Sequence, residues 1–116
     1  MARKLLRVTI LEKVDTDYGE ITVARVTKTG AVIYRQGNCH QSESDGKGVS
    51  LSSYIHALYG FLAQAGAQNV LLIGVGGGTL ANMLSSEGAR VTLVDINPVS
   101  FEVARLYFGL PDSLPR

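Results

Sequence analysis

The sequence has a single cysteine, three prolines and no tryptophan among its 116 residues. One cysteine, Cys39, excludes an internal disulfide and fits a reducing compartment, so we expect a cytoplasmic protein. The 11 basic and 10 acidic residues give a formal net charge of +1, which predicts no binding to nucleic acid or to an anionic membrane. No hydrophobic run approaches the roughly 18 residues that are needed to span a bilayer. The length and the composition of the chain are those of one ordinary globular domain.

The first part of the chain, residues 1–48, has the pattern of short strands that are separated by turns. Stretches rich in β-branched residues predict strands over residues 4–14, 20–27 and 31–35. We therefore expect a small antiparallel sheet or set of hairpins. Residues 37–48 are polar and contain several glycines, which indicates a loop.

The second part, residues 49–116, changes its hydrophobic period. Helical spacing predicts helices over residues 51–65, 79–87 and 98–108, with Ser50 and Asn97 as N-caps. The short apolar runs at 69–75 and 90–96 are typical of strands that are buried on both faces. The order of helix, strand, helix, strand and helix predicts the opening of a doubly wound parallel α/β sheet.

A glycine motif, residues 74–78, lies between the first of these strands and the helix that follows it. Glycines at a helix N-terminus let a ligand approach the backbone amides, so we predict that Gly74, Gly76 and Gly78 form a binding turn. The spacing G-x-G-x-G differs from the dinucleotide pattern G-x-G-x-x-G, because Thr79 takes the place of the third glycine. A nicotinamide-dependent reductase is therefore a distant alternative. The simplest alternative is that the glycines form a tight turn that binds no ligand.

Asp95 stands at the end of the second predicted strand. An acid at this point of a nucleoside-binding α/β domain accepts hydrogen bonds from both ribose hydroxyls. Ile96 follows it and is expected to lie against the adenine. A helix-capping role for Asp95 is less favoured, because Asn97 and Pro98 already provide a cap. Together with the glycine motif, these residues predict a nucleoside site.

The glycine motif and Val94-Asp95-Ile96-Asn97 resemble the S-adenosylmethionine-binding half of class I methyltransferases. More narrowly, the chain resembles the start of the spermidine synthases, or polyamine aminopropyltransferases. These carry a small β domain, the motif I-G-G-G-D-G, an acid–Ile–acid tripeptide and a helix that ends in R-x-Y-F. The counterparts here are residues 73–78, 95–97 and 105–108.

The resemblance implies a small antiparallel β region and then the first βαβα units of an incomplete, Rossmann-like methyltransferase sheet. It implies decarboxylated S-adenosylmethionine or S-adenosylmethionine as co-substrate, without a metal, and transfer of an aminopropyl group to a polyamine. The family's polyamine-facing loop has the form D-G-x-x-Q-x-x-x-x-D-E-x-x-Y. Counted from Gly37, His40 replaces the glutamine unless a one-residue shift lets Gln41 serve, and Asp45 matches an acid. His40, Gln41 and Asp45 are therefore the substrate-binding candidates.

Two departures affect the expected activity. Gly77 replaces the acid of the family's glycine motif, which removes a contact near the sulfonium end. The sequence also ends before the family's third strand and its D-x-x-D loop with the catalytic acid, so we predict no catalytic residue. We expect a truncated or inactive form that self-associates, or pairs with a missing C-terminal part, because two apolar strands leave exposed edges. An S-adenosylmethionine-dependent methyltransferase and a non-catalytic nucleoside-binding or association domain stay as alternatives.

The remaining polar side chains carry weaker signals. Cys39 and His40 are neighbours in the sequence, but a metal site needs about four ligands and we find no such set. Adjacency in sequence does not argue for a catalytic Cys–His pair either. His56 lies on a predicted helix beside Ile55 and is expected to be a packed or half-exposed residue.

Overall fold

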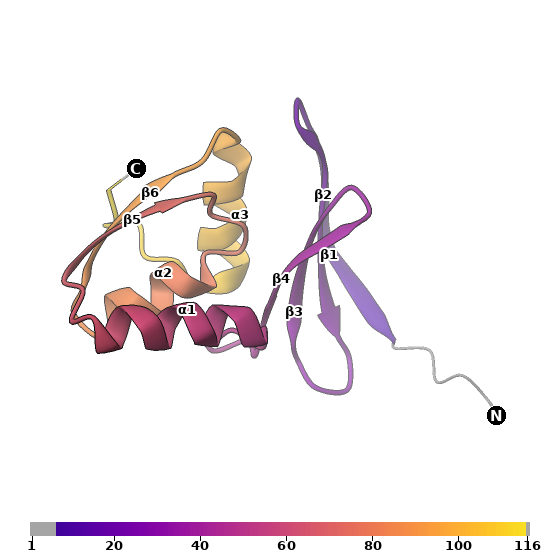
Figure 1. Ribbon diagram of the computed structural model, residues 1–116. Coiled ribbons are helices and arrows are strands. Elements are labelled where there is room, and N and C mark those ends of the chain that lie inside the picture. Colours follow the sequence, from indigo (N-terminus) through magenta and orange to yellow (C-terminus); the bar gives the residue numbers. More distant parts are fainter. Residues whose placement is uncertain (1–6, 116) are drawn as a thin grey trace.

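The computed structural model describes residues 7–115 and has a mixed α/β architecture (Figure 1). An antiparallel sheet with the strand order β1-β2-β3-β4 precedes a parallel pair, β5-β6, and its helices. The expected β region followed by the opening of a methyltransferase-like sheet is thereby confirmed. The elements are β1 (Val8–Thr16), β2 (Gly19–Val26), β3 (Val32–Gln36), β4 (Cys39–Ser44), α1 (Ser53–Gln64), β5 (Asn69–Ile73), α2 (Thr79–Ser86), β6 (Arg90–Val94) and α3 (Pro98–Phe108).

The antiparallel sheet contains one strand that the sequence did not reveal. Residues 37–48 were expected to be a loop, but Cys39–Ser44 forms β4 and pairs with β3. This strand lies at the edge of the sheet and most of its side chains are exposed or half-buried, so it lacks the hydrophobic alternation of a core strand. The start of the first predicted strand, residues 4–6, lies outside the described residues.

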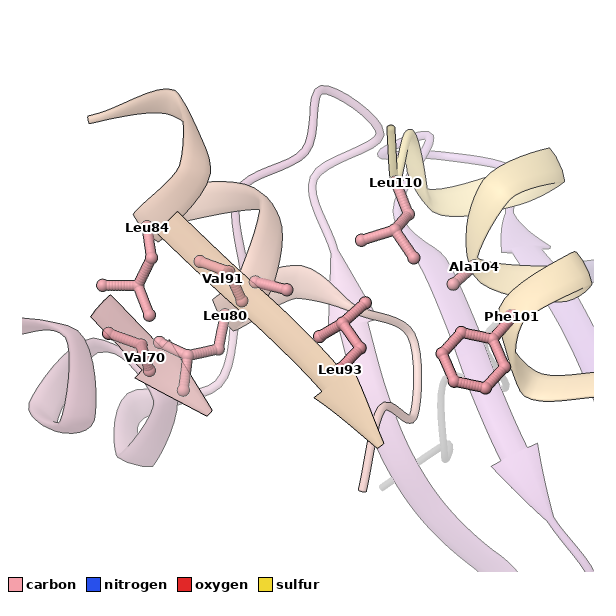
Figure 2. Packing of buried hydrophobic residues seen from close by; sticks show 9 residues of the cluster. Val70, Leu80, Leu84, Val91, Leu93, Phe101, Ala104 and Leu110 are labelled. Carbon is pink, nitrogen blue, oxygen red and sulfur yellow. The ribbon is translucent and has the colours of Figure 1, made fainter. Parts of the chain in front are cut away.

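The helix α3 lies between the two sheets and packs on both of them (Figure 1). Val103 and Phe108 join a core with residues of β2 and β3, where the rings of Phe108 and Tyr34 meet edge to face at 6.2 Å. Phe101 and Ala104 join the core of the parallel pair, as Figure 2 shows. The two parts of the chain therefore share buried side chains through one helix.

The parallel pair is buried on one face only. Val70, Val91 and Leu93 point into the core beneath α2 and α3 (Figure 2). On the opposite face Leu71 is 60% exposed and Ile73 is 80% exposed. The expectation that both strands are buried on both faces was wrong, because no described element packs on this second face.

The start of α3 follows its local sequence signal, whereas the start of α1 does not. α3 begins as predicted, with Pro98 in the first turn and Asn97 Oδ1 accepting a hydrogen bond from the amide of Val99 at 3.1 Å. α1 begins one residue after Ser52, and the predicted cap Ser50 is instead buried and bridged to Ser44. None of the described helices combines the length and the hydrophobicity that a membrane span requires.

Candidate functional site

A cavity of about 350 Å³ lies where β5 and β6 end. In parallel α/β sheets, ligands bind at the carboxyl ends of the strands. Three of the residues predicted to bind the nucleoside, Gly74, Gly76 and Asp95, line this cavity together. The other walls come from α1, α2, α3, β3 and β4, with the side chains of Tyr34, Gln36, Gln41, Ser42, Tyr54, Ile55, Leu58, Thr79, Leu80, Ala81 and Ser100.

Asp95 fixes the shape of the cavity floor. Its Oδ2 accepts a hydrogen bond from the amide of Val75 at 2.7 Å, and its Oδ1 accepts one from the amide of Asn97 at 2.8 Å. A carboxylate has about four acceptor positions, so further acceptor positions remain for a ligand. Asp95 therefore has a structural role in addition to the predicted ribose contact.

The glycine turn offers fewer amides than its sequence implies. The amide of Gly77 donates to Ser42 Oγ at 3.0 Å, and the amide of Gly78 donates to the carbonyl of Val75 at 2.8 Å. The amide of Gly74 donates to the carbonyl of Val94 at 2.7 Å and that of Val75 to Asp95, so four amides of this segment already have partners within the protein. A ligand here would therefore contact the turn mainly at the exposed backbone of its glycines, rather than through hydrogen bonds to its amides.

The glycines of the motif have different surroundings. A Cβ at Gly74 would have no neighbour within 4 Å, so this residue faces the open space of the cavity. A Cβ at Gly76 would lie 2.9 Å from Ser42 Oγ, and one at Gly78 would lie 3.1 Å from Leu110 Cδ1. Gly78 does not line the cavity: it allows α2 to begin close to Leu110 and Ala104. Close packing within the protein explains why residue 78 is a glycine, whereas the glycine at position 74 leaves room for a ligand.

A β-bulge in β4 decides which of the candidates His40 and Gln41 faces the cavity. Tyr34 pairs with Ser42 and Arg35 pairs with His40, so Gln41 is the extra residue. Gln41 lines the cavity, while His40 is exposed and lies 3.8 Å from Glu43. Of these two candidates the strand therefore presents Gln41 to the cavity, and a role of Gln41 in substrate binding stays a prediction.

The other predicted residues do not line the cavity. Asp45 Oδ1 accepts hydrogen bonds from the amides of Lys47 and Val49, at 2.7 Å and 3.1 Å, and closes the turn after β4. Ile96 is 74% exposed beside Asp95. His56 is exposed rather than packed, and its Nε2 lies 2.6 Å from the carbonyl oxygen of Ser50.

Two buried hydroxyl groups of the cavity wall were not identified from the sequence. Tyr34 is fully buried, and its Oη lies 3.1 Å from Ser100 Oγ at the start of α3. Burial raises the pKa of Tyr34, the hydrogen bond from Ser100 lowers it, and the nearby charge of Asp95 raises it further. The alternation of apolar residues in β3 predicts an inward Tyr34, but its partner on a distant helix has no sequence signal.

Within residues 7–115 we find no group of three or more His, Cys, Asp or Glu side chains that could hold a metal ion. The free thiol of Cys39 is exposed. A larger hollow of about 590 Å³ lies at the opposite end of the strands, near Tyr59, Glu87 and Arg90. It lacks the glycine turn and lies at the amino ends of the strands, so we assign the candidate site to the smaller cavity.

Comparison with known proteins identifies the fold. No family model and no curated protein sequence matches the chain. Two crystal structures of spermidine synthase are similar to it, each with a TM-score of 0.66 and 20% sequence identity over 92% of this chain. One is a complex with the transition state analogue AdoDATO, and the other is the enzyme from Thermotoga maritima. The match covers 39% and 38% of those chains, so this chain has a spermidine synthase-like fold over about two fifths of their length.

Proposed function

We propose that the chain is the nucleoside-binding part of a spermidine synthase-like protein and binds an adenosyl-sulfur compound in the cavity at the ends of β5 and β6. The observation that carries the proposal is that Gly74, Gly76 and Asp95 line one cavity. The complex of a spermidine synthase with AdoDATO supports a nucleoside-type ligand. Asp95 is the acceptor for the ribose hydroxyls, and the exposed Ile96 provides an apolar contact for the adenine.

The reaction that the fold supports is aminopropyl transfer from decarboxylated S-adenosylmethionine to a polyamine in the reducing cytoplasm. A neutral amine attacks the carbon beside the sulfonium, the C–S bond breaks, and its electron pair stays on sulfur. The amine then loses a proton to a base. Among the described residues, Asp95 is the one carboxylate that lines the cavity, and its oxygens already hold the amides of Val75 and Asn97. The proposed role of the described residues is to bind and orient the nucleoside.

A second candidate function is a non-catalytic domain that binds a nucleoside. The presence of a single carboxylate among the described lining residues favours this candidate, because a site that only binds a nucleoside needs no proton acceptor. Detection of aminopropyl transfer by the purified chain, with spermidine as the measured product, would contradict this candidate. An S-adenosylmethionine-dependent methyltransferase would instead transfer a methyl group, and the same incubation with S-adenosylmethionine tests it.

Calorimetry with S-adenosylmethionine, its decarboxylated form and methylthioadenosine tests the proposed site. At least one compound is expected to bind, and Asp95→Ala is expected to abolish binding. Asp17→Ala, which removes an exposed carboxylate between β1 and β2, is the matched control and should bind normally. Strong binding of NADH without a response to any adenosyl-sulfur compound would refute the proposal.

A second variant covers the possibility that Asp95→Ala unfolds. Ile96 is 74% exposed, so Ile96→Ser is expected to leave the stability nearly unchanged. Covering an isoleucine with a base is worth about 1–2 kcal/mol, which corresponds to roughly a tenfold loss of affinity. An unchanged affinity in a folded Ile96→Ser protein would place the base elsewhere.

A further inference from the structure

The glycine turn that follows β5 is held from the antiparallel sheet by one side chain, Ser42. Ser42 Oγ accepts a hydrogen bond from the amide of Gly77 at 3.0 Å, although the two residues are 35 positions apart in the sequence. Ser42 belongs to β4, is half-buried, and lines the same cavity as Gly74, Gly76 and Asp95. A residue of the antiparallel sheet therefore contacts the turn that the nucleoside is proposed to meet.

The packing around this hydrogen bond leaves little room for side chains on the turn. A Cβ at Gly76 would lie 2.9 Å from Ser42 Oγ. Gly77 is buried, and a Cβ there would lie 3.0 Å from Ser42 Cβ and 3.0 Å from Phe108 Cδ1. Because glycine has the greatest conformational freedom of all residues, a turn of successive glycines depends on such outside contacts to keep one path.

Two side chains from different parts of the chain hold the turn at neighbouring points. Asp95 Oδ2 accepts a hydrogen bond from the amide of Val75 at 2.7 Å, and Ser42 Oγ holds the amide of Gly77. Gly76 lies between these two fixed amides, and its backbone lines the cavity. A shift of the Gly77 end would move the backbone of Gly76 relative to Asp95, and a site binds most tightly when its contacts are already held in place.

We infer that Ser42 is a positioning residue of the nucleoside site: by holding the Gly77 amide, it fixes the glycine turn in the shape that the ligand meets. This inference rests on the proposed nucleoside site. The Ser42 hydroxyl acts through the turn, so the antiparallel sheet sets the affinity of a site whose other binding residues belong to the second part of the chain. Loss of one such hydrogen bond corresponds to about a tenfold loss of affinity.

The first measurement is calorimetry on full-length Ser42→Ala and Ser44→Ala with methylthioadenosine, S-adenosylmethionine and decarboxylated S-adenosylmethionine. Ser44 is the matched control: it lies on the same strand, its Oγ accepts a hydrogen bond from the amide of Gly46 at 3.2 Å, and it does not line the cavity. Ser44 is also the more deeply buried, so urea denaturation is expected to show at least as large a loss of stability in Ser44→Ala. Only Ser42→Ala is expected to lose affinity, by about tenfold. Equal affinities of the two variants would overturn the inference.

A conservative variant tests whether the hydroxyl itself is responsible. Ser42→Thr keeps the acceptor oxygen on a β-branched side chain, which suits a strand, and is expected to bind as the parent does. A folded Ser42→Thr protein that binds as weakly as Ser42→Ala would overturn the inference.

Hydrogen exchange of the Gly77 amide, followed by NMR in the free protein, separates positioning from direct contact with the ligand. Exchange is expected to be faster in Ser42→Ala than in the parent and unchanged in Ser44→Ala. A loss of affinity without faster exchange would show that the Ser42 hydroxyl contacts the ligand instead of fixing the turn, and would overturn the inference. If the parent binds none of the three compounds, the proposed nucleoside site itself fails; if the parent and Ser42→Ala bind equally, the inference alone fails.

Discussion

Asp95 Oδ2 and the backbone nitrogen of Val75 are 2.7 Å apart, so a side chain at the end of β6 holds the first residues of the turn that follows β5. The other oxygen of the same carboxylate holds the amide of Asn97, which caps α3. One side chain thus connects the glycine turn to the helix that packs on both sheets. A ligand that bound Asp95 would act on a residue that already joins these elements.

Replacement of Asp95 is expected to lower stability as well as binding. Asp95→Ala removes two hydrogen bonds to a charged acceptor, which we expect to reduce the free energy of unfolding by about 2–3 kcal/mol. Asp95→Asn keeps one acceptor oxygen and should lose about half as much. Urea denaturation measures both values. If the two variants were as stable as the parent, the contacts with Val75 and Asn97 would contribute nothing.

The buried pair Tyr34 and Ser100 is expected to show coupling. Tyr34→Phe leaves Ser100 Oγ buried without this partner, and we expect a loss of about 1–2 kcal/mol in the free energy of unfolding. Tyr34→Phe combined with Ser100→Ala should cost less than the sum of the two single variants, because neither hydroxyl is then left alone. A double-mutant cycle by urea denaturation measures the coupling, and strict additivity would contradict the prediction.

Stability is expected to fall at alkaline pH because of Tyr34. Burial raises its pKa in the folded state above the usual value of about 10, so the unfolded chain loses this proton first as the pH rises. The contribution is fully present below about pH 10 and is lost as the pH rises toward the folded-state pKa. Thermal unfolding between pH 8 and 11 should show a smaller alkaline loss in Tyr34→Phe than in Tyr18→Phe, which removes an exposed phenol. Equal losses in both variants would rule out Tyr34 as the cause.

Gly78 is expected to be intolerant of any side chain. Its φ is +73°, and a Cβ would lie 3.1 Å from Leu110 Cδ1 and 3.4 Å from Ala104 Cβ. Gly78→Ala should reduce the free energy of unfolding by about 1–3 kcal/mol through backbone strain, with a further loss from this contact. Gly88→Ala is the control, because Gly88 has a similar φ of +88° but no neighbour within 4 Å of its Cβ. Equal losses by urea denaturation would show that the contact has no cost.

Self-association of the chain is expected to depend on the uncovered face of the parallel pair. Leu71 and Ile73 are 60% and 80% exposed on that face, and removal of such surface from water drives association. Light scattering of the full chain should show assemblies larger than 12.4 kDa, and Leu71→Thr with Ile73→Thr should reduce their size. Phe61→Ser, which removes a residue on α1 that is 77% exposed, is the control and should have a smaller effect. A monodisperse 12.4 kDa parent would contradict the prediction.

The elements that the sequence predicted well have their signals within a few residues. Asn97 and Pro98 define the start of α3, and the switch of hydrophobic period separates the strands from the helices of the second part. β4 could not be predicted, because its strand conformation depends on pairing with β3 and its side chains are mostly polar. Ser50 satisfied the local rule for an N-cap, but it is used in a bridge to Ser44.

The residues of the candidate site likewise divide into those that have a sequence signal and those that have none. Gly74, Gly76 and Asp95 could be found because parallel strands bring their carboxyl ends to one edge of a sheet, whatever the rest of the chain does. Ser42 and Tyr34 reach the cavity from the antiparallel sheet, through the hydrogen bond of Ser42 with the Gly77 amide and the packing of Tyr34 against α3. No local pattern records such a contact between distant segments.

The bulge at Gln41 makes the chemistry of this wall depend on the length of one strand. The bulge makes Gln41 an extra residue between His40, which pairs with Arg35, and Ser42, which pairs with Tyr34. A chain that lost this one residue would keep both pairings, so the ladder would become regular and the cavity wall would lose an amide side chain. A single codon deletion would therefore remove a polar group from the site while the pairing of β3 with β4 stays in register.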